Sequence, residues 1–281
     1  GGAAPLPGFS RESLADAAAH ARRLASSLPD TDLPDSDLDA LFGGLPDADL
    51  PPSVRFAVES AVVELWAATR GTSVVDVLGG GAETVALNAL ITDDADLEAE
   101  AERVQAAGYR AVKLKVGRRS VEADAARVRT LRAALDGAVG LRLDANRAWT
   151  PEEARAFVDA VDDLPLDYLE EPLRDPAGLP DLVDATGLSV ALDETTREAA
   201  PEALPDDLRV RAVVLKPTLL GGLTAARRWA HWAREHGAVP VVSASYESGV
   251  GLRTLAALAV TLSDAPAGLS TYSRLAADVL T

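Results

Sequence analysis

The chain contains only three lysines, Lys113, Lys115 and Lys216, although lysine and arginine together number 27. Lys113 and Lys115 lie in Ala-Val-Lys-Leu-Lys-Val, and Lys216 lies in Val-Val-Leu-Lys-Pro. Both segments are typical of buried strands, which argues against lysines left over on the surface. Arginine stays charged, whereas burial can lower the pKa of a lysine until it carries protons near neutral pH. The three positions therefore indicate acid–base chemistry.

Three carboxylates, Asp144, Glu170 and Asp193, each end an apolar segment. From Lys113 through these carboxylates to Ser243, such strand ends recur every 23 to 31 residues, about the length of one strand–helix unit. In a barrel of parallel strands these ends meet at one rim. Carboxylates gathered there repel one another unless a cation joins them, and oxygen ligands without cysteine or histidine select Mg²⁺, or else Mn²⁺. The alternative is three solvated carboxylates at the starts of loops.

The lysines flank this expected metal site. Lys113 and Lys115 are two residues apart on one strand, so their side chains project to the same face. Lys216 comes four strands later, roughly across an eight-stranded barrel. We expect a small-molecule substrate whose carboxylate binds the metal while a lysine removes the proton next to it. Desolvation and nearby positive charge should lower the lysine pKa toward neutrality.

From about residue 85 onward, short runs rich in Val, Leu and Ala alternate with amphipathic helical segments. The pattern predicts strands at 85–91, 111–116, 140–144, 167–170, 189–193, 212–216 and 239–243, and a weaker one at 268–271. Helices are predicted at 96–107, 121–135, 151–161, 223–235 and 252–262. Such alternation predicts an α/β fold with a parallel (β/α)8-type barrel. A doubly wound open sheet is the alternative, but no G-x-G-x-x-G motif follows the first strand.

Residues 1–84 differ from the rest of the chain. Two helices are predicted there, at 11–27 and 53–70, and the second has apolar residues at helical spacing. Segments rich in proline and aspartate, at 28–39 and 45–52, separate them. We therefore predict a mostly helical cap at 1–84, a catalytic barrel at 85–270, and a C-terminal segment at 271–281 that returns toward the cap.

The composition excludes several classes of protein. The net charge of −17 argues against nucleic-acid binding, which needs a basic face. No apolar run reaches the roughly 18 residues that span a bilayer, and no secretory signal is visible, so we expect a cytoplasmic protein without a membrane partner. The absence of cysteine excludes disulfides and thiol chemistry. The acidic, lysine-poor composition indicates a salt-adapted organism, and the lack of methionine leads us to expect an incomplete reading frame.

Five short motifs resemble the signature of the enolase superfamily, in its muconate-lactonizing branch. They are Lys113-Leu-Lys115, Asp144-Ala-Asn146, Glu170-Glu-Pro172, Asp193-Glu194 and Lys216-Pro217. Within that branch, segments 5–10, 141–149, 213–219 and 243–248 are most similar to the o-succinylbenzoate synthase family. The resemblance implies a modified (β/α)7β barrel with an α+β capping domain. That domain is expected to be N-terminally incomplete here, because its first strands have no counterpart in this sequence.

The resemblance also implies a role for each lysine. Lys115 is expected to be the general base, and then the acid that protonates a departing hydroxide. Lys216 faces it and stabilises the enediolate, and Lys113 supports Lys115 and the substrate carboxylate. The implied Mg²⁺ ligands are the three carboxylates identified above, Asp144, Glu170 and Asp193.

Further residues are implied by the resemblance alone. Asn146 and Glu194 are expected to support the metal ligands from outside. Ser243 is expected to contact a second, succinyl carboxylate of the substrate, and Arg142 to belong to the pocket. Leu6 and Phe9 are expected to lie in a cap loop that closes over the substrate.

The implied reaction is a Mg²⁺-dependent syn dehydration that yields 2-succinylbenzoate in menaquinone biosynthesis. Two alternatives stay open. Lysines on opposite sides also suit a dipeptide epimerase or an N-acylamino-acid racemase. A barrel that has lost catalysis and serves as a binding protein is the alternative of another class. His20, His231 and His236 fall on predicted helices, away from the strand ends, and are set aside.

Overall fold

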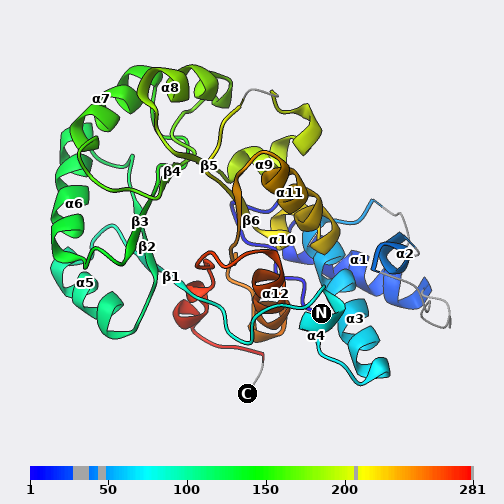
Figure 1. Cartoon of the computed structure of the whole chain (residues 1–281). Helices are drawn as coiled ribbons and strands as arrows, with labels where there is room; N and C mark the ends of the chain where they lie inside the picture. The colour runs from blue at the N-terminus through cyan, green and yellow to red at the C-terminus, as the bar shows by residue number, and fades with distance from the viewer. Residues whose placement is uncertain (28–37, 44–48, 206–207, 280–281) are drawn as a thin grey trace.

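The computed structural model describes the chain except for residues 28–37, 44–48, 206–207 and 280–281. Seven parallel strands follow one another in chain order around a barrel, with helices outside them (Figure 1). The strands are β1 (Asn88–Ile91), β2 (Ala111–Lys115), β3 (Gly140–Asp144), β4 (Tyr168–Glu170), β5 (Val190–Leu192), β6 (Ala212–Leu215) and β7 (Val239–Val242). The predicted alternation of strands and helices is confirmed.

Within the described residues, two isolated bridges close the gap between β7 and β1. Ala267 pairs with Leu87, and Gly268 pairs with Ser243, both in parallel orientation. The chain then turns into the 3₁₀ helix η3 (Ser270–Arg274). The prediction of a weak strand at 268–271 is therefore wrong, because only two residues cross the gap before the chain turns.

Three of the helices around the barrel begin at side chains that accept hydrogen bonds from the first turn, namely α5 (Leu97–Ala106), α6 (Val121–Ala134) and α7 (Pro151–Val161). Ser120 accepts from the N–H of Ala123, and Thr150 forms a capping box with Glu153. The other helices are α8 (Leu179–Thr186), α9 (Glu194–Glu198), α10 (Pro217–Leu220), α11 (Leu223–Glu235) and α12 (Gly249–Leu262), with 3₁₀ turns η1 (Pro176–Gly178) and η2 (Pro201–Ala203). The sequence pattern missed α8, α9 and α10, which are too short to show a clear helical period.

The described part of residues 1–84 consists of helices and connecting loops. The helices are α1 (Leu14–Ser27), α2 (Leu38–Gly43), α3 (Pro52–Arg70) and α4 (Val74–Val77). Figure 1 shows them on one side of the barrel, next to α11 and α12. Both predicted helices of this region are present, whereas most of the predicted proline- and aspartate-rich segments lies outside the described residues. The domain boundaries at 84 and 270 stay predictions.

The two faces of each strand carry different residues, because side chains alternate along a strand. On β2, Leu114 is fully buried, and it lies between Lys113 and Lys115, which line a cavity at the barrel mouth. Leu143 and Leu169 are the equivalent buried leucines of β3 and β4. Burial of each such side chain stabilises the fold by about 1.5–3 kcal/mol. No helix in the described part of the chain has both the length and the apolar character needed to cross a bilayer.

Candidate active site

The strand register brings the predicted catalytic and metal-binding side chains together. Lys115, Asp144 and Glu170 are direct neighbours across β2, β3 and β4, and each is the last residue of its strand. Asp193 and Lys216 directly follow β5 and β6. All three carboxylates are at most 1% exposed. The prediction that these residues come from successive strand ends is confirmed.

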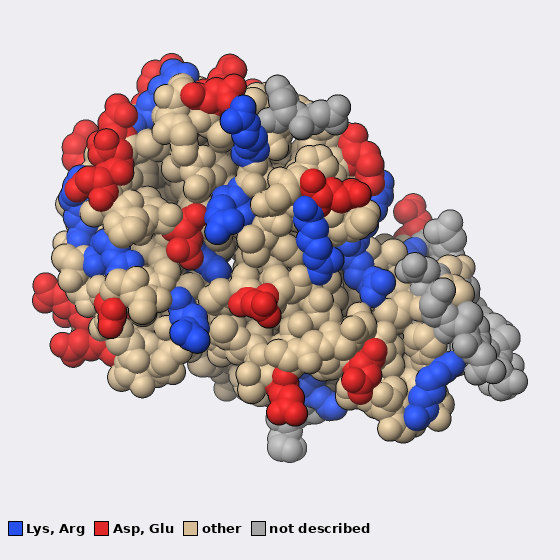
Figure 2. Space-filling view, viewed as in Figure 1, with Lys and Arg blue, Asp and Glu red and all other residues tan. Residues whose placement is uncertain are grey.

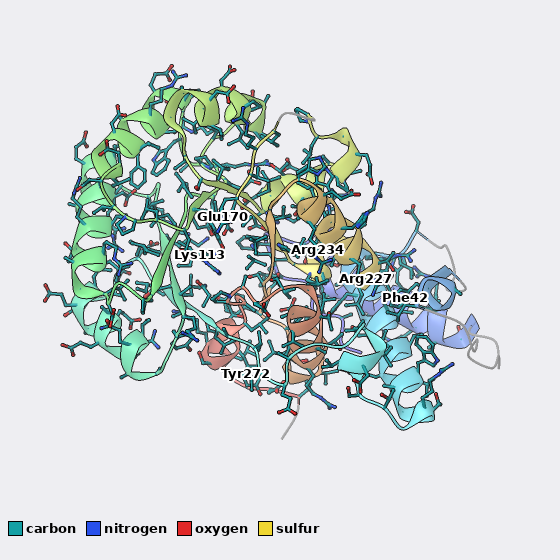
Figure 3. All side chains as sticks on the ribbon, viewed as in Figure 1. Phe42, Lys113, Glu170, Arg227, Arg234 and Tyr272 are labelled. Carbon is teal, nitrogen blue, oxygen red and sulfur yellow. The ribbon has the colours of Figure 1, made fainter. Side chains whose placement is uncertain are left out.

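Amino groups contact the carboxylates from two sides. Lys113 Nζ lies 3.1 Å from Asp144 Oδ2 and 3.1 Å from both carboxylate oxygens of Glu170. Lys115 Nζ lies 2.6 Å from Asp144 Oδ2, and Lys216 Nζ donates to Asp193 Oδ2. Figure 3 shows Lys113 and Glu170 inside the ring of strands. The site is thus a compact cluster of three buried carboxyl groups and three lysines.

Burial and mutual charge shift the pKa values in this cluster. Burial, together with the charge of Asp144, raises the pKa of Glu170 to about 8. Burial would also raise the pKa of Asp144, but the charges of Lys113 and Lys115 outweigh it and hold that pKa below its usual range. Burial would lower the pKa of Lys113 and Lys216, but the nearby carboxylates outweigh it and raise both. The expectation of lowered lysine pKa values is therefore wrong for these two lysines in this structure.

The donor set fits a hard divalent cation. Asp144, Glu170 and Asp193 offer only oxygen, and Asp193 Oδ1 is buried without a hydrogen-bond partner. Among the residues that the structure describes, no three acidic or histidine side chains are arranged to hold a metal ion as they stand. The physical reason is that the carboxylates are paired with lysine amino groups. The assignment of the three carboxylates as Mg²⁺ ligands stays a prediction.

Asn146 and Glu194 extend the cluster outward from Lys115. Lys115 Nζ donates to Asn146 Oδ1, and Asn146 Nδ2 donates to Glu194 Oε1 at 3.0 Å. Asn146 has a φ of 44°, a left-handed conformation that only a few residue types other than glycine adopt readily. The two residues therefore orient the amino group of Lys115, and their role as supports of the metal ligands stays a prediction.

The sequence analysis missed Glu171, a second buried carboxylate directly after Glu170. Glu171 Oε1 accepts from the N–H of Asp193 at 2.9 Å and from that of Thr195 at 2.7 Å. Its other oxygen accepts from Thr195 Oγ1 and from Arg147 Nε, both at 3.1 Å. Glu171 thus fixes the backbone from which the Asp193 side chain extends. The available signal was the doubled acid in Glu-Glu-Pro, since a second carboxylate beside a buried one needs its own partners.

A cavity of about 260 Å³ opens above the lysines, at the carboxyl ends of the strands. Leu6, Phe9 and Ser243 line it, as do all three lysines. Their roles as substrate contacts stay predictions.

One wall of this cavity is formed by neutral polar side chains that the sequence analysis also missed. Asn88 of β1, Ser245 after β7 and Thr271 in η3 lie there. Asn88 Oδ1, Ser245 Oγ and Thr271 Oγ1 are buried and have no hydrogen-bond partner. A ligand that fills the cavity can satisfy these groups.

Arg142 does not belong to this cavity, which corrects the prediction. Its guanidinium donates to the carbonyl of Pro266 at 2.7 Å, lies 3.4 Å from Asp167 and sits 5.2 Å from the ring centroid of Tyr168. It lines a separate hollow that also includes Val239, at the amino end of β7. The reason is that Arg142 precedes Asp144 by two residues, so it shares the inward face but lies one layer deeper in the barrel.

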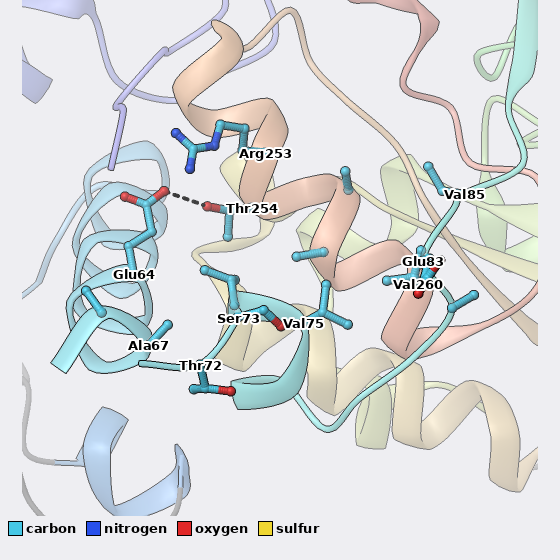
Figure 4. A pocket seen from close by; sticks show the side chains of 15 residues that line it. Glu64, Ala67, Thr72, Ser73, Val75, Glu83, Val85, Arg253, Thr254 and Val260 are labelled. Atoms are coloured by element: carbon cyan, nitrogen blue, oxygen red, sulfur yellow. Dashed lines mark hydrogen bonds between the residues drawn. The ribbon is translucent and has the colours of Figure 1, made fainter. Parts of the chain in front are cut away.

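A second, larger cavity lies between α3, α4 and α12 (Figure 4). Its volume is about 610 Å³, and alanine and valine form most of its lining. Thr254 donates to Glu64 at 3.5 Å across it. None of the predicted site residues contributes to this cavity, so it offers no chemistry comparable to that of the barrel mouth.

Comparison with known proteins identifies the family. The family model described as Enolase C-terminal domain-like matches residues 96–280. The o-succinylbenzoate synthase of Pasteurella multocida is 33% identical over 264 residues, which cover 91% of this chain and 72% of that protein. The chloroplastic protein PHYLLO of Arabidopsis thaliana is 37% identical over 220 residues, but the match covers 72% of this chain and only 13% of PHYLLO.

Solved structures have the same fold. A substrate-liganded complex of the L-Ala-D/L-Glu epimerase from Bacillus subtilis matches with a TM-score of 0.86 and 25% identity, over 98% of this chain and 79% of that one. The dipeptide epimerase of Enterococcus faecalis, complexed with Mg and a dipeptide, matches with a TM-score of 0.84 and 23% identity, over 97% of this chain and 78% of that one. The second likeness supports the barrel fold alone. Together with the family model and the relatives, these findings show that the chain belongs to the enolase superfamily of enzymes.

Proposed function

We propose that the protein is an o-succinylbenzoate synthase. It would dehydrate 2-succinyl-6-hydroxy-2,4-cyclohexadiene-1-carboxylate to 2-succinylbenzoate, a step of menaquinone biosynthesis. The observation that carries the proposal is the cluster at the strand ends, in which Lys115 and Lys216 approach three buried carboxylates from different strands. The identity to a relative with that activity supports the choice of reaction.

Asp144, Glu170 and Asp193 would hold Mg²⁺, which supplies electrophilic stabilisation of the substrate carboxylate when bound. Lys115 donates to Asp144 Oδ2, so the carboxylate that would hold the ion also positions the amine of the proposed base. The contact between Lys115 and Asn146 keeps the amine aimed at the cavity.

The reaction then needs one proton to move twice. Lys115 removes the hydrogen next to the ring carboxylate, and the electron pair left behind expels the neighbouring hydroxyl group. The Lys115 ammonium returns the same proton to the departing hydroxide, so the products are water and the aromatic ring. Lys216, on the far side of the cluster, stabilises the negative charge that develops on the substrate.

The neutral wall fits the other end of this substrate. A succinyl carboxylate needs hydrogen-bond donors, and the hydroxyl groups of Ser245 and Thr271 are buried without partners. The amide group of Asn88 adds a further donor after rotation of its side chain. Neutral donors can bind the succinyl carboxylate there, and the lysine cluster stays available for the ring carboxylate at the other end of the substrate.

A dipeptide epimerase or N-acylamino-acid racemase is the second candidate. The placement of Lys115 and Lys216 on β2 and after β6 favours it, because a two-base mechanism needs a proton carrier on each face of the substrate carbon. The likeness to the epimerase of Bacillus subtilis supports the same candidate.

The test is turnover of the cyclohexadiene carboxylate by purified protein with Mg²⁺, followed by the absorbance of the aromatic product. We expect dehydration and no exchange of α-hydrogens of dipeptides or N-acylamino acids with deuterated solvent. Exchange without dehydration would assign the second candidate instead. Folded protein that performs neither reaction would reject both.

A further inference from the structure

Helix α11 has no capping side chain of its own. Its N-cap residue is Gly222, whose φ is 105° and which offers no side chain to the free N–H groups of the first turn. A residue from the helical region at 1–84 supplies the missing hydrogen-bond acceptor. Glu59 of α3 accepts from the N–H of Thr224 at 3.0 Å and from its hydroxyl at 3.0 Å. A carboxylate also interacts favourably with the positive end of the helix dipole.

Both Glu59 and Gly222 have features that this contact requires. Glu59 is fully buried, and a guanidinium nitrogen of Arg55 on the same helix lies 3.8 Å from its carboxylate. A Cβ atom at Gly222 would lie 2.3 Å from Glu59 Oε2, so any larger residue would collide with the carboxylate. The positive φ of Gly222 also favours glycine. The cap helix and the start of α11 are therefore shaped to each other.

The same contact lies one short helix away from Lys216. Lys216 is the N-cap residue of α10, and its carbonyl accepts from Leu219 at 2.8 Å and from Leu220 at 2.9 Å. The carbonyl of Pro217 accepts from Gly222 at 2.9 Å. The residue bonded to Gly222 is therefore Pro217, the direct neighbour of Lys216 in the chain, so the glycine beside Glu59 is tied to the start of α10. Helix α3 packs along α10, so the cap contacts this segment along its length (Figure 1).

We propose that Glu59 is a positioning residue, through which the cap fixes the backbone that carries Lys216. The proposal rests on the proposed function, in which Lys216 stabilises charge on the substrate. Of the proposed metal ligands, Asp144 and Glu170 end β3 and β4 and Asp193 follows β5, whereas Glu59 contacts the start of α11. Loss of Glu59 should therefore disturb the chemical step while metal binding is kept.

The test compares Glu59→Ala and Glu59→Gln with the wild-type protein, and uses Glu64→Ala as the matched control. Glu64 lies on the same helix but contacts Thr254 of α12. We expect Glu59→Ala to lower kcat by about 10- to 100-fold, since small displacements of a catalytic group have effects of this size. KM and the Mg²⁺ affinity should stay within about threefold, because a purely positional change of Lys216 leaves the ligands intact. Glu59→Gln should restore most of kcat, since its amide oxygen can still accept from Thr224.

Two results would overturn the proposal. One is a folded Glu59→Ala protein with unchanged kcat, which would leave only a role in stability. The other is a loss of kcat in Glu64→Ala as large as that in Glu59→Ala. If Glu59→Ala fails to fold, Thr224→Ala tests the proposal instead, because it removes only the hydrogen bond from the Thr224 hydroxyl to Glu59. It should lower kcat in the same direction by a smaller factor, and an unchanged kcat would overturn the proposal.

The outcome can be separated from that of the proposed function. Each variant is compared with wild type on whichever reaction the wild-type protein performs, dehydration or exchange of α-hydrogen with deuterated solvent. A wild-type protein that only exchanges hydrogen would reject the dehydration, while the ratio between Glu59→Ala and wild type would still test the positioning of Lys216.

Discussion

The two halves of the barrel mouth differ in charge. From β2 to β6, the strand ends carry lysines and carboxylates, and these groups pair with one another. From β7 through the closing bridges to β1, the polar side chains that line the cavity are neutral, and within the described residues Asn88 Oδ1 and Ser245 Oγ have no hydrogen-bond partner. Among the described residues, the lysines and carboxylates of the ionic half are thus mostly paired with one another, with Asp193 Oδ1 left over, whereas this hydroxyl and this amide oxygen of the neutral half lack partners. We infer that the first half performs the chemistry and the second recognises the substrate, so variants in the two halves should separate kcat from KM.

Lys115→Met should have the largest effect, because it removes the proposed general base from the ionic half and keeps an apolar chain of similar length. General base catalysis contributes about 10²–10⁴-fold, so we expect kcat to fall by about 10³-fold. KM should change little. The measurement is steady-state kinetics with Mg²⁺ at saturation.

Mg²⁺ affinity, measured by titration calorimetry, provides the control for this variant. Lys115 donates to Asp144 Oδ2, so its removal leaves that oxygen with Lys113 as its lysine partner and should not weaken metal binding. A kcat within about tenfold of wild type would remove Lys115 from the role of base, because the expected contribution is much larger.

Glu171→Gln tests whether the ionic half needs its supporting carboxylate. Both carboxylate oxygens of Glu171 accept hydrogen bonds from their neighbours. In either orientation of a glutamine amide, its NH₂ group would replace one of these acceptors and face a donor. The backbone that carries Asp193 should shift, and we expect Mg²⁺ affinity to fall by about 10- to 100-fold. Titration calorimetry measures this loss.

Glu198→Gln is the matched control, because Glu198 also binds Arg147, but its side chain is exposed and does not accept from the backbone N–H of Asp193, which donates to Glu171. We expect its Mg²⁺ affinity to equal that of wild type. An equal loss in both variants would show that the arginine, and not the backbone of Asp193, transmits the effect.

The ionic half was predictable from the sequence because strand ends recur at a fixed interval in a parallel barrel. A lysine or carboxylate that interrupts an apolar strand is rare enough to be noticed, and Lys115, Asp144 and Glu170 do lie side by side. Depth along the barrel was not predictable in the same way. The side chain of Arg142 lies on the predicted inward face of its strand. The two-residue alternation along a strand does not predict how deep in the barrel a side chain lies, and Arg142 lies below the site.

The neutral half could not be predicted for a different reason. Serine, threonine and asparagine are common at turns, so Ser245 or Thr271 gives no signal until tertiary packing buries its hydroxyl without a partner. The closing bridges at Ala267 and Gly268 form through single residue pairs, which leave no alternation to detect. Contacts over long sequence distances, such as Glu59 with Thr224, likewise leave no trace in local patterns.

Ser245→Ala should have the smallest effect and is the sharpest test of the neutral half. The hydroxyl is buried without a partner, so its removal should leave the free energy of unfolding unchanged or slightly higher. If it donates to the distal carboxylate of the substrate, its loss costs about 1 kcal/mol of binding, and KM should rise about fivefold with kcat unchanged. A substrate amidated at that carboxylate should bind the variant and the wild-type protein with nearly equal affinity.

Ser263→Ala is the matched control, because the Ser263 hydroxyl is satisfied by the carbonyl of Pro240 at 2.6 Å, near the amino end of β7. Removing it should lower the free energy of unfolding by about 1 kcal/mol and leave KM unchanged. The two variants thus predict opposite patterns from the same chemical change. If Ser245→Ala instead lowers stability and leaves KM alone, the unpaired hydroxyl is not a substrate contact, and recognition has to be assigned to another part of the cavity.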